Sequence, residues 1–328
     1  MRILPILVFF SLLPAAGLAQ SGPSPFDQLA GHFDYPRTAP LNFDERGVER
    51  RGNVLIIDLT YDGGSDGDHV PAYLVVPHGD GPFAAILWGH WMMKGSPLRN
   101  RDEFLEEALV LARSGVMSLL IDAPMVRPDY KAKSMDEDPL EWAVQSSEDE
   151  RRQVVDLRRG IDLLLSRRHV DPRRVAYVGH SFDAHAGAIL AGVEKRINTF
   201  VLMAGTYADE EEVRAAKDGD LFKWRQKVGE DKLDQYFRDY SWDDPANFIS
   251  HTDGKSILLQ FASGDGVTEA QAQKMLAGFS AKDKQMQLYQ AGHALNAAAR
   301  LDRDHWLQQH LKLKKLDEGA LRQIPQLK

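Results

Sequence analysis

Short apolar runs alternate with longer amphipathic segments along most of the chain. Eight of these runs have the length and composition of strands: Val54 to Tyr61, His69 to Pro77, Ala84 to Trp88, Val116 to Ile121, Val175 to Val178, Thr199 to Ala204, Ser256 to Ala262 and Gln285 to Gln290. A glycine-rich loop joins the first two, so we expect them to be antiparallel edge strands. Strands that alternate with helices predict a mainly parallel, eight-stranded sheet with helices on both faces.

Two segments between these runs are predicted to be crossover helices. Apolar side chains recur at helical spacing from Arg101 to Ser114, and Gly115 follows as a suitable C-terminal residue. A longer helix starts with the acidic stretch 147–150 and buries one face.

The charged segment Asp209 to Tyr240 is also helical in pattern and carries several aromatic residues. It is interpreted either as a small helical lid or as surface helices that pack their aromatic side chains on the body of the domain.

The N-terminus has the organisation of a secretory signal peptide. A charged start, Met1-Arg2, precedes the apolar stretch Ile3 to Leu13, and small residues lead to Ala19. The apolar stretch is shorter than the about 20 residues of a membrane span, so we expect no membrane anchor after cleavage. The predicted organisation is a signal peptide over 1–19, an arm over 20–52, one domain over 53–315 with a lid insertion at 207–250, and a tail over 316–328. A periplasmic or secreted location is expected.

Composition narrows the classes of partner. The net charge is −8 and the chain has no basic tract, which argues against nucleic acid. It also has no cysteine, so no disulfide supports the fold. His180 and His185 are five positions apart, unlike the pair of a helical zinc motif, and no glycine-rich phosphate loop follows the first parallel strand. We therefore expect no metal and no cofactor, and a small molecule as the partner.

The triplet Gly179-His180-Ser181 marks a sharp turn between a strand and a helix. It follows the apolar run Val175 to Val178 and opens a segment of small residues. Such a turn lifts a serine hydroxyl to the carboxyl edge of the sheet, beside the free amide groups of a helix N-terminus. Ser181 is therefore the predicted nucleophile for acyl transfer.

The position two residues after Ser181 usually holds glycine in this motif, but here it holds Asp183. We expect its carboxylate to crowd the turn and to face the negative charge that develops during the reaction. At an assumed 6 Å and an effective dielectric near 20, the repulsion is about 3 kcal/mol. His180, His185 or an arginine is expected to neutralise it.

Two later loops supply an acid and a base. The run Ser256 to Ala262 leads into a tight loop that contains Asp265, and the final strand leads into the loop that contains His293. We assign Asp265 as the acid that orients the base, and His293 as the base that takes the serine proton. Taken alone, Asp265 is better explained as an ordinary turn residue, and His293 is equally well explained as a helix cap.

The loop after Trp88 is the candidate source of a second group that stabilises the oxyanion. Amide groups that stabilise an oxyanion come from the residue after the nucleophile and from such a loop, so Phe182 and Met92 are the expected donors. Trp91 is expected to line the acyl pocket together with His90. The alternative for His90 is ordinary packing in the core.

These segments together resemble the α/β-hydrolase superfamily, in particular its dienelactone hydrolase-like group, which is related to acetyl-ester and prolyl-peptidase-like hydrolases. The resemblance covers most of the chain and is carried by Val70 to Pro77, Val155 to Ser181, the Asp265 loop and Ala291 to Asn296. It implies the same triad of Ser181, Asp265 and His293. The expected function is an exported serine hydrolase that cleaves a carboxylic ester or lactone. A prolyl-type peptidase and a catalytically silent binding protein of the same fold remain as alternatives.

Overall fold

The computed structural model describes residues 23–64, 68–207 and 209–326. The expected signal peptide and its cleavage position lie outside the described residues. Over the described ranges, no helix combines the length and the apolar character that a membrane crossing requires.

The described residues form one sheet of nine strands in the order β1-β2-β3-β5-β4-β6-β7-β8-β9. The pairs β1/β2, β2/β3 and β3/β5 are antiparallel. The six strands from β4 to β9, which include β5, run parallel to one another. The bounds are β1 Asp44–Arg51, β2 Val54–Asp62, β3 His69–Val76, β4 Phe83–Gly89, β5 Val116–Ile121, β6 Val170–His180, β7 Thr199–Met203, β8 Ser256–Ala262 and β9 Asp283–Tyr289. The mainly parallel sheet is confirmed, with one strand more than the eight expected.

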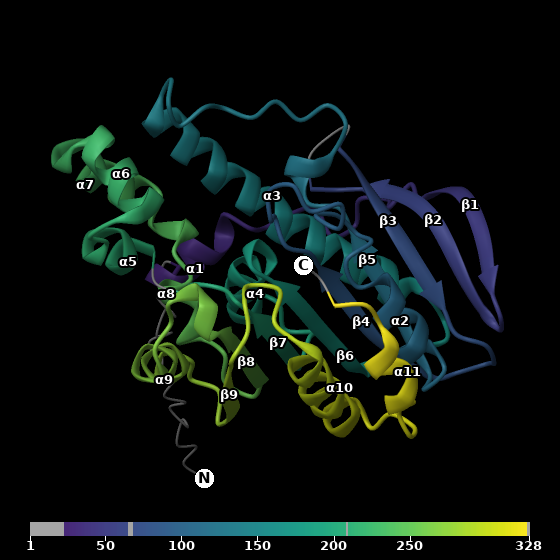
Figure 1. Ribbon diagram of the computed structural model, residues 1–328. Coiled ribbons are helices and arrows are strands. Elements are labelled where there is room, and N and C mark those ends of the chain that lie inside the picture. Colours follow the sequence, from purple (N-terminus) through teal and green to yellow (C-terminus); the bar gives the residue numbers. More distant parts are fainter. Residues whose placement is uncertain (1–22, 65–67, 208, 327–328) are drawn as a thin grey trace, which may run out of the picture.

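The additional strand β1 lies inside the segment that we expected to be an arm. Every residue of β1 is exposed, so its sequence lacks the alternation that identifies a half-buried strand. It forms by pairing with β2 along the edge of the sheet. Figure 1 shows β1, β2 and β3 together at one end of the molecule.

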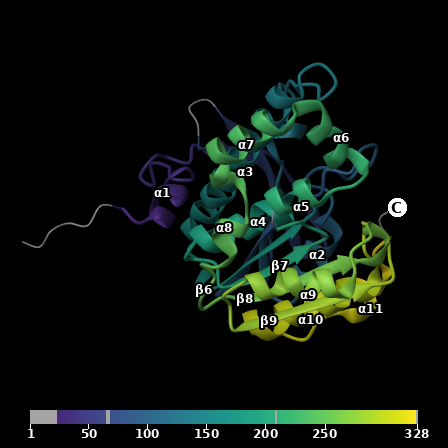
Figure 2. The same ribbon diagram turned by 90° about the vertical axis from the view of Figure 1, so that its left-hand side faces the viewer.

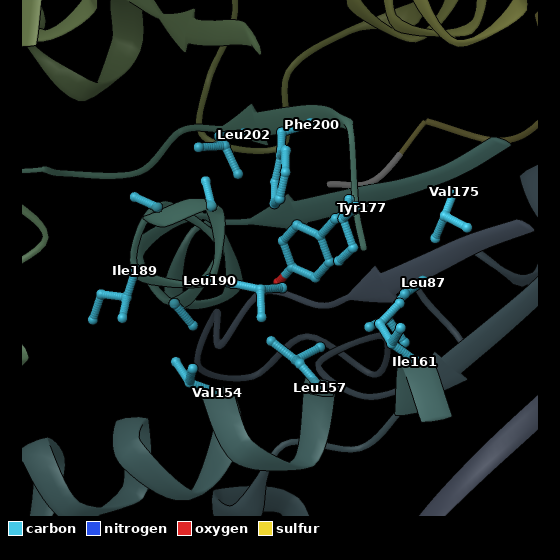
Figure 3. Packing of buried hydrophobic residues seen from close by; sticks show 14 of the residues in the cluster. Leu87, Val154, Leu157, Ile161, Val175, Tyr177, Ile189, Leu190, Phe200 and Leu202 are labelled. Carbon is cyan, nitrogen blue, oxygen red and sulfur yellow. The ribbon is translucent and has the colours of Figure 1, made fainter. Parts of the chain in front are cut away.

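Helices cover both faces of the sheet, as predicted (Figures 1 and 2). One hydrophobic cluster joins the sheet to α3 (Pro139–Ser166), α4 (Phe182–Val193), α8 (Ala246–Ile249) and α9 (Glu269–Gly278). The other cluster joins the opposite face to α2 (Leu105–Ala112), α10 (Ala297–Leu311) and α11 (Glu318–Gln323). Figure 3 shows Val154, Leu157 and Ile161 of α3 in the first cluster, near Tyr177 of β6. Their spacing of three and four positions is the helical period on which the prediction of this helix rested.

Three short helices beside the start of α3 form a unit that we call the cap: α5 (Asp209–Ala215), α6 (Gly219–Val228) and α7 (Glu230–Asp239). Their buried side chains form a small cluster of their own with Ala143, near the start of α3. The indole Nε1 of Trp224 donates to the carbonyl of Pro139 at 2.8 Å. Figure 1 shows the cap at one end of α3, away from strands β1 to β3.

The N-terminal arm is fastened to the body of the domain. It begins with α1 (Pro25–Gly31), and Phe33 beyond it is completely buried. The ring of Phe33 packs edge-on against Trp242 and Phe248. Arg158 of α3 donates to the carbonyl of Phe33 at 2.5 Å. The arm is thus part of the core that supports the segment after the cap.

Candidate active site

Ser181 lies at the sharp turn between β6 and α4, as the sequence predicts. Its φ of 56° and ψ of −112° are unusual for a residue with a side chain. Its N–H donates to the carbonyl of Met203 at 2.7 Å, which holds the turn against β7. A Cβ on Gly179 would lie 2.2 Å from the carbonyl oxygen of Asp183, so only glycine fits before the turn. The sequence thus places the serine hydroxyl at the carboxyl edge of the sheet.

The three predicted residues of the triad lie in one hydrogen-bonded chain. His293 Nε2 is 2.8 Å from Ser181 Oγ, and His293 Nδ1 is 2.9 Å from Asp265 Oδ2. They come from the loops that follow β6, β8 and β9, which belong to the parallel part of the sheet, with β7 between β6 and β8. Parallel strands bring their carboxyl ends to one edge, which explains how residues far apart in sequence meet. The arrangement allows the imidazole to take a proton from the hydroxyl while the carboxylate holds the ring.

A second pair of an acid and a histidine, Glu103 and His180, contacts the backbone of His293. His180 lies between Gly179 and Ser181, and its Nδ1 is 2.5 Å from Glu103 Oε1. Its Nε2 is 2.9 Å from the backbone oxygen of His293. Sequence reasoning did not identify Glu103, and it considered His180 only as one of several groups that could neutralise Asp183. Glu103 lies on the loop before α2, and nothing in the local pattern of that loop indicates its partner.

The predicted oxyanion donors face the same cavity as the serine. Met92 and Phe182 both line it together with Ser181. Phe182 is the first residue of α4, where an N–H has no acceptor within the helix. The N–H of Trp91 already donates to Glu103 Oε2 at 2.6 Å, which leaves the next amide, that of Met92. The roles of the two amides remain predictions.

His90 and Trp91, the first two residues after β4, are buried beside the site; Trp91 lines a second pocket together with His293, and the expected roles of the two side chains remain predictions. Each of the two side chains is 1% exposed. His90 Nδ1 contacts the carbonyl of Trp91 at 2.8 Å, and the N–H of Ala123 donates to His90 Nε2 at 3.0 Å. Burial lowers the pKa of His90 to about 4, so the ring is neutral. The indole of Trp91 lies parallel to the ring of His293, with a centroid distance of 6.3 Å.

Asp183 is accommodated in a way that the sequence did not indicate. A Cβ on Gly89 would lie 2.4 Å from the Asp183 carboxyl carbon, so this glycine of β4 provides the room. Gln153 Nε2 donates to Asp183 Oδ1 at 2.6 Å, and the hydroxyl of Tyr177 donates to the backbone oxygen of Asp183 at 2.6 Å.

Asp183 also carries no charge near neutral pH. Its side chain is completely buried, and this burial raises its pKa to about 8. The carboxyl group is therefore mostly protonated at pH 7. Our prediction that Asp183 repels the oxyanion is therefore wrong at that pH. No histidine or arginine is required to neutralise this carboxyl group.

A cavity of about 660 Å³ opens beside Ser181 and His293. Its walls come from the cap, from the start of α3 and from the loop after β5, which contributes Met125 and Tyr130. The loop after β5 therefore borders the site. The volume lies within the range of pockets that bind small molecules.

A third histidine lies one helical turn beyond Ser181. His185 of α4 contacts Glu150 of α3 through Nδ1, and its Nε2 is 2.8 Å from Asp209 Oδ2. Although burial opposes it, Asp209 and Glu150 raise the pKa of His185 well above its usual value. No group of three or more His, Asp or Glu side chains in the described part of the chain is arranged to hold a metal ion.

The chain was compared with known proteins. No family model and no curated protein matches it. Among solved structures it is similar to an acetyl xylan esterase from Paenibacillus sp. R4, with a TM-score of 0.66, 18% identity, and coverage of 87% of this chain and 92% of the other. Acetyl xylan esterase 1 from Thermoanaerobacterium sp. JW/SL YS485 gives a TM-score of 0.62 and 16% identity, covering 89% and 95%.

A glucuronoyl esterase from Solibacter usitatus gives a TM-score of 0.58 and 14% identity, covering 88% of this chain and 91% of the other. These identities are low, so the likeness concerns the fold. It agrees with the mainly parallel sheet and its helical layers. The protein therefore has the α/β-hydrolase fold.

Proposed function

We propose that this protein is a serine hydrolase that cleaves a carboxylic ester or lactone through an acyl-enzyme intermediate. The observation that carries the proposal is the hydrogen-bonded chain from Ser181 Oγ through His293 to Asp265. A serine hydroxyl is a weak nucleophile unless a base takes its proton. Here His293 is the base and Asp265 is the group that orients it.

In the first half of the proposed reaction, Ser181 Oγ forms a bond to the carbonyl carbon of the ester, and His293 Nε2 takes the hydroxyl proton. The carbonyl oxygen becomes an oxyanion, which the amides of Phe182 and Met92 stabilise. The bond to the alkoxy oxygen then breaks, and the alcohol leaves with the proton from His293. Removal of one oxyanion donor typically costs a factor of about 100 to 1,000 in turnover.

In the second half, water attacks the acyl carbon and gives a proton to His293. The bond between the acyl carbon and Ser181 Oγ breaks, Ser181 regains the proton, and the carboxylic acid leaves. The sum is one ester and one water converted to one acid and one alcohol. No cofactor takes part in these steps.

Two further observations support an ester as the substrate. The structures that resemble this fold include two acetyl xylan esterases and a glucuronoyl esterase. Burial also raises the pKa of Asp183 to about 8, so most of this carboxyl group is protonated at pH 7 and opposes the oxyanion less than we expected, which favours catalysis over a silent protein. The dienelactone hydrolase-like group remains the proposed subtype.

We further propose that the protein acts in the periplasm or outside the cell. The proposal rests on the sequence of residues 1–19, in which a charged start, an apolar stretch and small residues follow one another. N-terminal sequencing of the exported protein would test it, and a chain that begins at Met1 would contradict it.

Turnover of p-nitrophenyl acetate and of a prolyl amide tests the proposed reaction. We expect hydrolysis of the ester by the wild type, and a loss of at least about a thousandfold in Ser181→Ala. Ser146→Ala is the matched control because Ser146 lines the same cavity, and its hydroxyl donates only to the carbonyl of Trp142. Preferential cleavage of the amide would favour a prolyl-type peptidase. No turnover of either substrate would favour a silent binding protein.

A further inference from the structure

The loop that carries His293 is fastened at alternate backbone carbonyl groups by different parts of the chain. The accepting residues are Ala291, His293 and Leu295, and the donors are the N–H of Gly264, His180 Nε2 and Gln326 Nε2 at 2.9, 2.9 and 3.0 Å. The first two donors lie next to Asp265 and Ser181 in the chain. The third belongs to the segment after α11 (Figure 1), for which we expected only a tail. This segment therefore contacts the loop of the proposed base directly.

The contact at Leu295 holds a backbone conformation that needs support. Leu295 has a φ of 58°, in the left-handed region that a residue with a branched side chain seldom adopts. Such a conformation persists only where the surrounding structure holds it. The Leu295 side chain is buried in the hydrophobic cluster that joins the sheet to α2 and α10, and its N–H donates to the carbonyl of Gly292 at 2.8 Å. The hydrogen bond from Gln326 adds a restraint on the Leu295 carbonyl, two positions after His293.

Residues 324–326, which we call the strap, are themselves fixed to the domain. Arg300 of α10 donates to the carbonyls of Leu321, Ile324 and Pro325 at 3.1, 3.0 and 3.3 Å. A guanidinium carries five N–H donors in one plane, so one side chain can bind several carbonyl groups. The side chain of Ile324 packs against the same hydrophobic cluster as Leu295. The strap is therefore tied to α10, the helix that begins soon after His293.

The strap also lines a second cavity, which has a volume of about 440 Å³. Glu103 and Ala294 line the same cavity, and Ala294 is the residue after His293. Glu103 contacts His180, which in turn contacts the backbone oxygen of His293. The strap thus lies beside a second contact that fixes the loop, as well as making one of its own.

We propose that the strap positions the catalytic base. Through Gln326 it fixes the end of the His293 loop, and thereby the distance from His293 Nε2 to Ser181 Oγ. The inference rests on the proposed function and adds a positioning residue outside the triad. Because a displacement near 1 Å costs about a hundredfold in rate, a partial release of the loop should lower turnover. Substrate binding in the cavity beside Ser181 should change little, since Gln326 does not line that cavity.

Three substitutions at Gln326 separate the hydrogen bond from the size of the side chain. Gln326→Ala removes the donor, and Gln326→Glu keeps the size but has no N–H to donate. For both, we expect kcat for p-nitrophenyl acetate to fall about threefold to tenfold while KM stays within about twofold. Gln326→Lys retains a donor and should keep at least about half of the wild-type kcat. A loss in KM instead of kcat would indicate contact with substrate in the pocket that Gln326 lines with His293, and would overturn the positioning role.

Gln308→Ala is the matched control. Gln308 Nε2 donates to the carbonyl of Lys314 at 3.0 Å, so the same kind of group makes a hydrogen bond of the same length. That bond joins the end of α10 to the residues after it, away from the His293 loop. Gln308→Ala should therefore keep the wild-type kcat, and thermal unfolding should show that every variant is folded at the assay temperature. An equal fall of kcat in Gln308→Ala and Gln326→Ala would indicate a general effect on stability and would overturn the inference.

Hydrogen exchange tests the strap without relying on activity. In a peptide that covers residues 290–296, mass spectrometry should show exchange at least about threefold faster in Gln326→Ala than in the wild type and in Gln308→Ala, because the loop opens more often. Unchanged exchange in Gln326→Ala, or an unchanged kcat, would overturn the inference and leave the proposed esterase function intact. If the wild type hydrolyses no ester, the proposed function fails, and exchange alone decides whether the strap holds the loop.

Discussion

At the scale of single residues, Asp183 shows how a structure changes the meaning of a sequence feature. In the sequence it is an ionisable residue at a position that favours glycine. In the fold, the missing side chain of Gly89 gives it space, Gln153 donates to it, and burial raises its pKa to about 8. The residue that most argued against catalysis is thus a neutral, hydrogen-bonded part of the core.

The raised pKa of Asp183 predicts a pH dependence of stability. The folded protein holds the proton up to about pH 8, whereas an unfolded aspartate loses it near 3.8. The contribution of this group to the free energy of unfolding is therefore complete below pH 3.8, and it falls by up to about 1.4 kcal/mol per pH unit as pH rises toward 8. Asp183→Asn cannot titrate, so its stability relative to the wild type should rise between pH 5 and pH 8. Urea unfolding of both proteins at several pH values measures this difference, and a difference that is constant with pH would contradict the assignment.

The sequence identified the triad because each member follows a separate apolar strand. Ser181, Asp265 and His293 could be placed at one sheet edge from the strand pattern alone. Glu103 could not, because its partners Trp91 and His180 come from distant segments and no spacing rule links them. The burial of Trp91 and His90 was not predicted either, since the sequence does not show which way a loop folds after its strand ends.

At the scale of elements, the site depends on contacts among three loops. Glu103 lies before α2, Trp91 follows β4, and His180 ends β6 beside Ser181. Glu103 accepts from the N–H of Trp91 and faces the ring of His180, whose other nitrogen contacts the backbone of His293. We infer that this carboxylate sets the position of the His293 loop and of the Met92 amide relative to the serine.

Replacement of this carboxylate predicts a loss in turnover rather than in binding. Glu103→Gln keeps one acceptor oxygen but turns an amide donor toward either Trp91 or His180. A misplacement near 1 Å costs about a hundredfold in rate, so kcat for p-nitrophenyl acetate should fall about tenfold to a hundredfold while KM changes little. Steady-state kinetics separates the two parameters. Glu106→Gln, at an exposed residue that pairs with Arg51, is the matched control and should retain kcat. An unchanged kcat in Glu103→Gln would refute the positioning role.

Most strands and the crossover helices were predictable because burial imposes a regular pattern on them. Strand β1 was not, because all of its residues are exposed and its pairing with β2 alone defines it. The cap combines features of both interpretations of its sequence, a lid and a pair of surface helices. Its helices pack their aromatic side chains on each other and on α3, and they also line the cavity. Whether the cap moves as a lid remains a prediction.

At the scale of the whole molecule, the arm that precedes the sheet belongs to the core. Phe33 is completely buried between Trp242 and Phe248, and its carbonyl accepts from Arg158. The sequence indicated an arm over 20–52, but not where it packs. This contact fastens the segment that carries Asp243, so the arm supports one wall of the cavity.

Phe33→Ala should therefore destabilise the protein strongly. Truncation of a buried phenylalanine costs about 3 to 5 kcal/mol in the free energy of unfolding, because it removes apolar contacts and leaves a cavity. Phe43→Ala is the matched control, since Phe43 is 43% exposed and should cost far less. Urea unfolding at pH 7 measures both variants. Equal losses for the two would show that the arm does not contribute to the core in this way.

The central claim is that Ser181 is an activated nucleophile, and covalent labelling tests it most directly. The wild type should react with a fluorophosphonate at one site per chain, which peptide mass spectrometry should map to Ser181. The variants Ser181→Ala and His293→Ala should remain unlabelled or react far more slowly. A folded wild type that does not react, or a label that maps to another residue, would contradict the account.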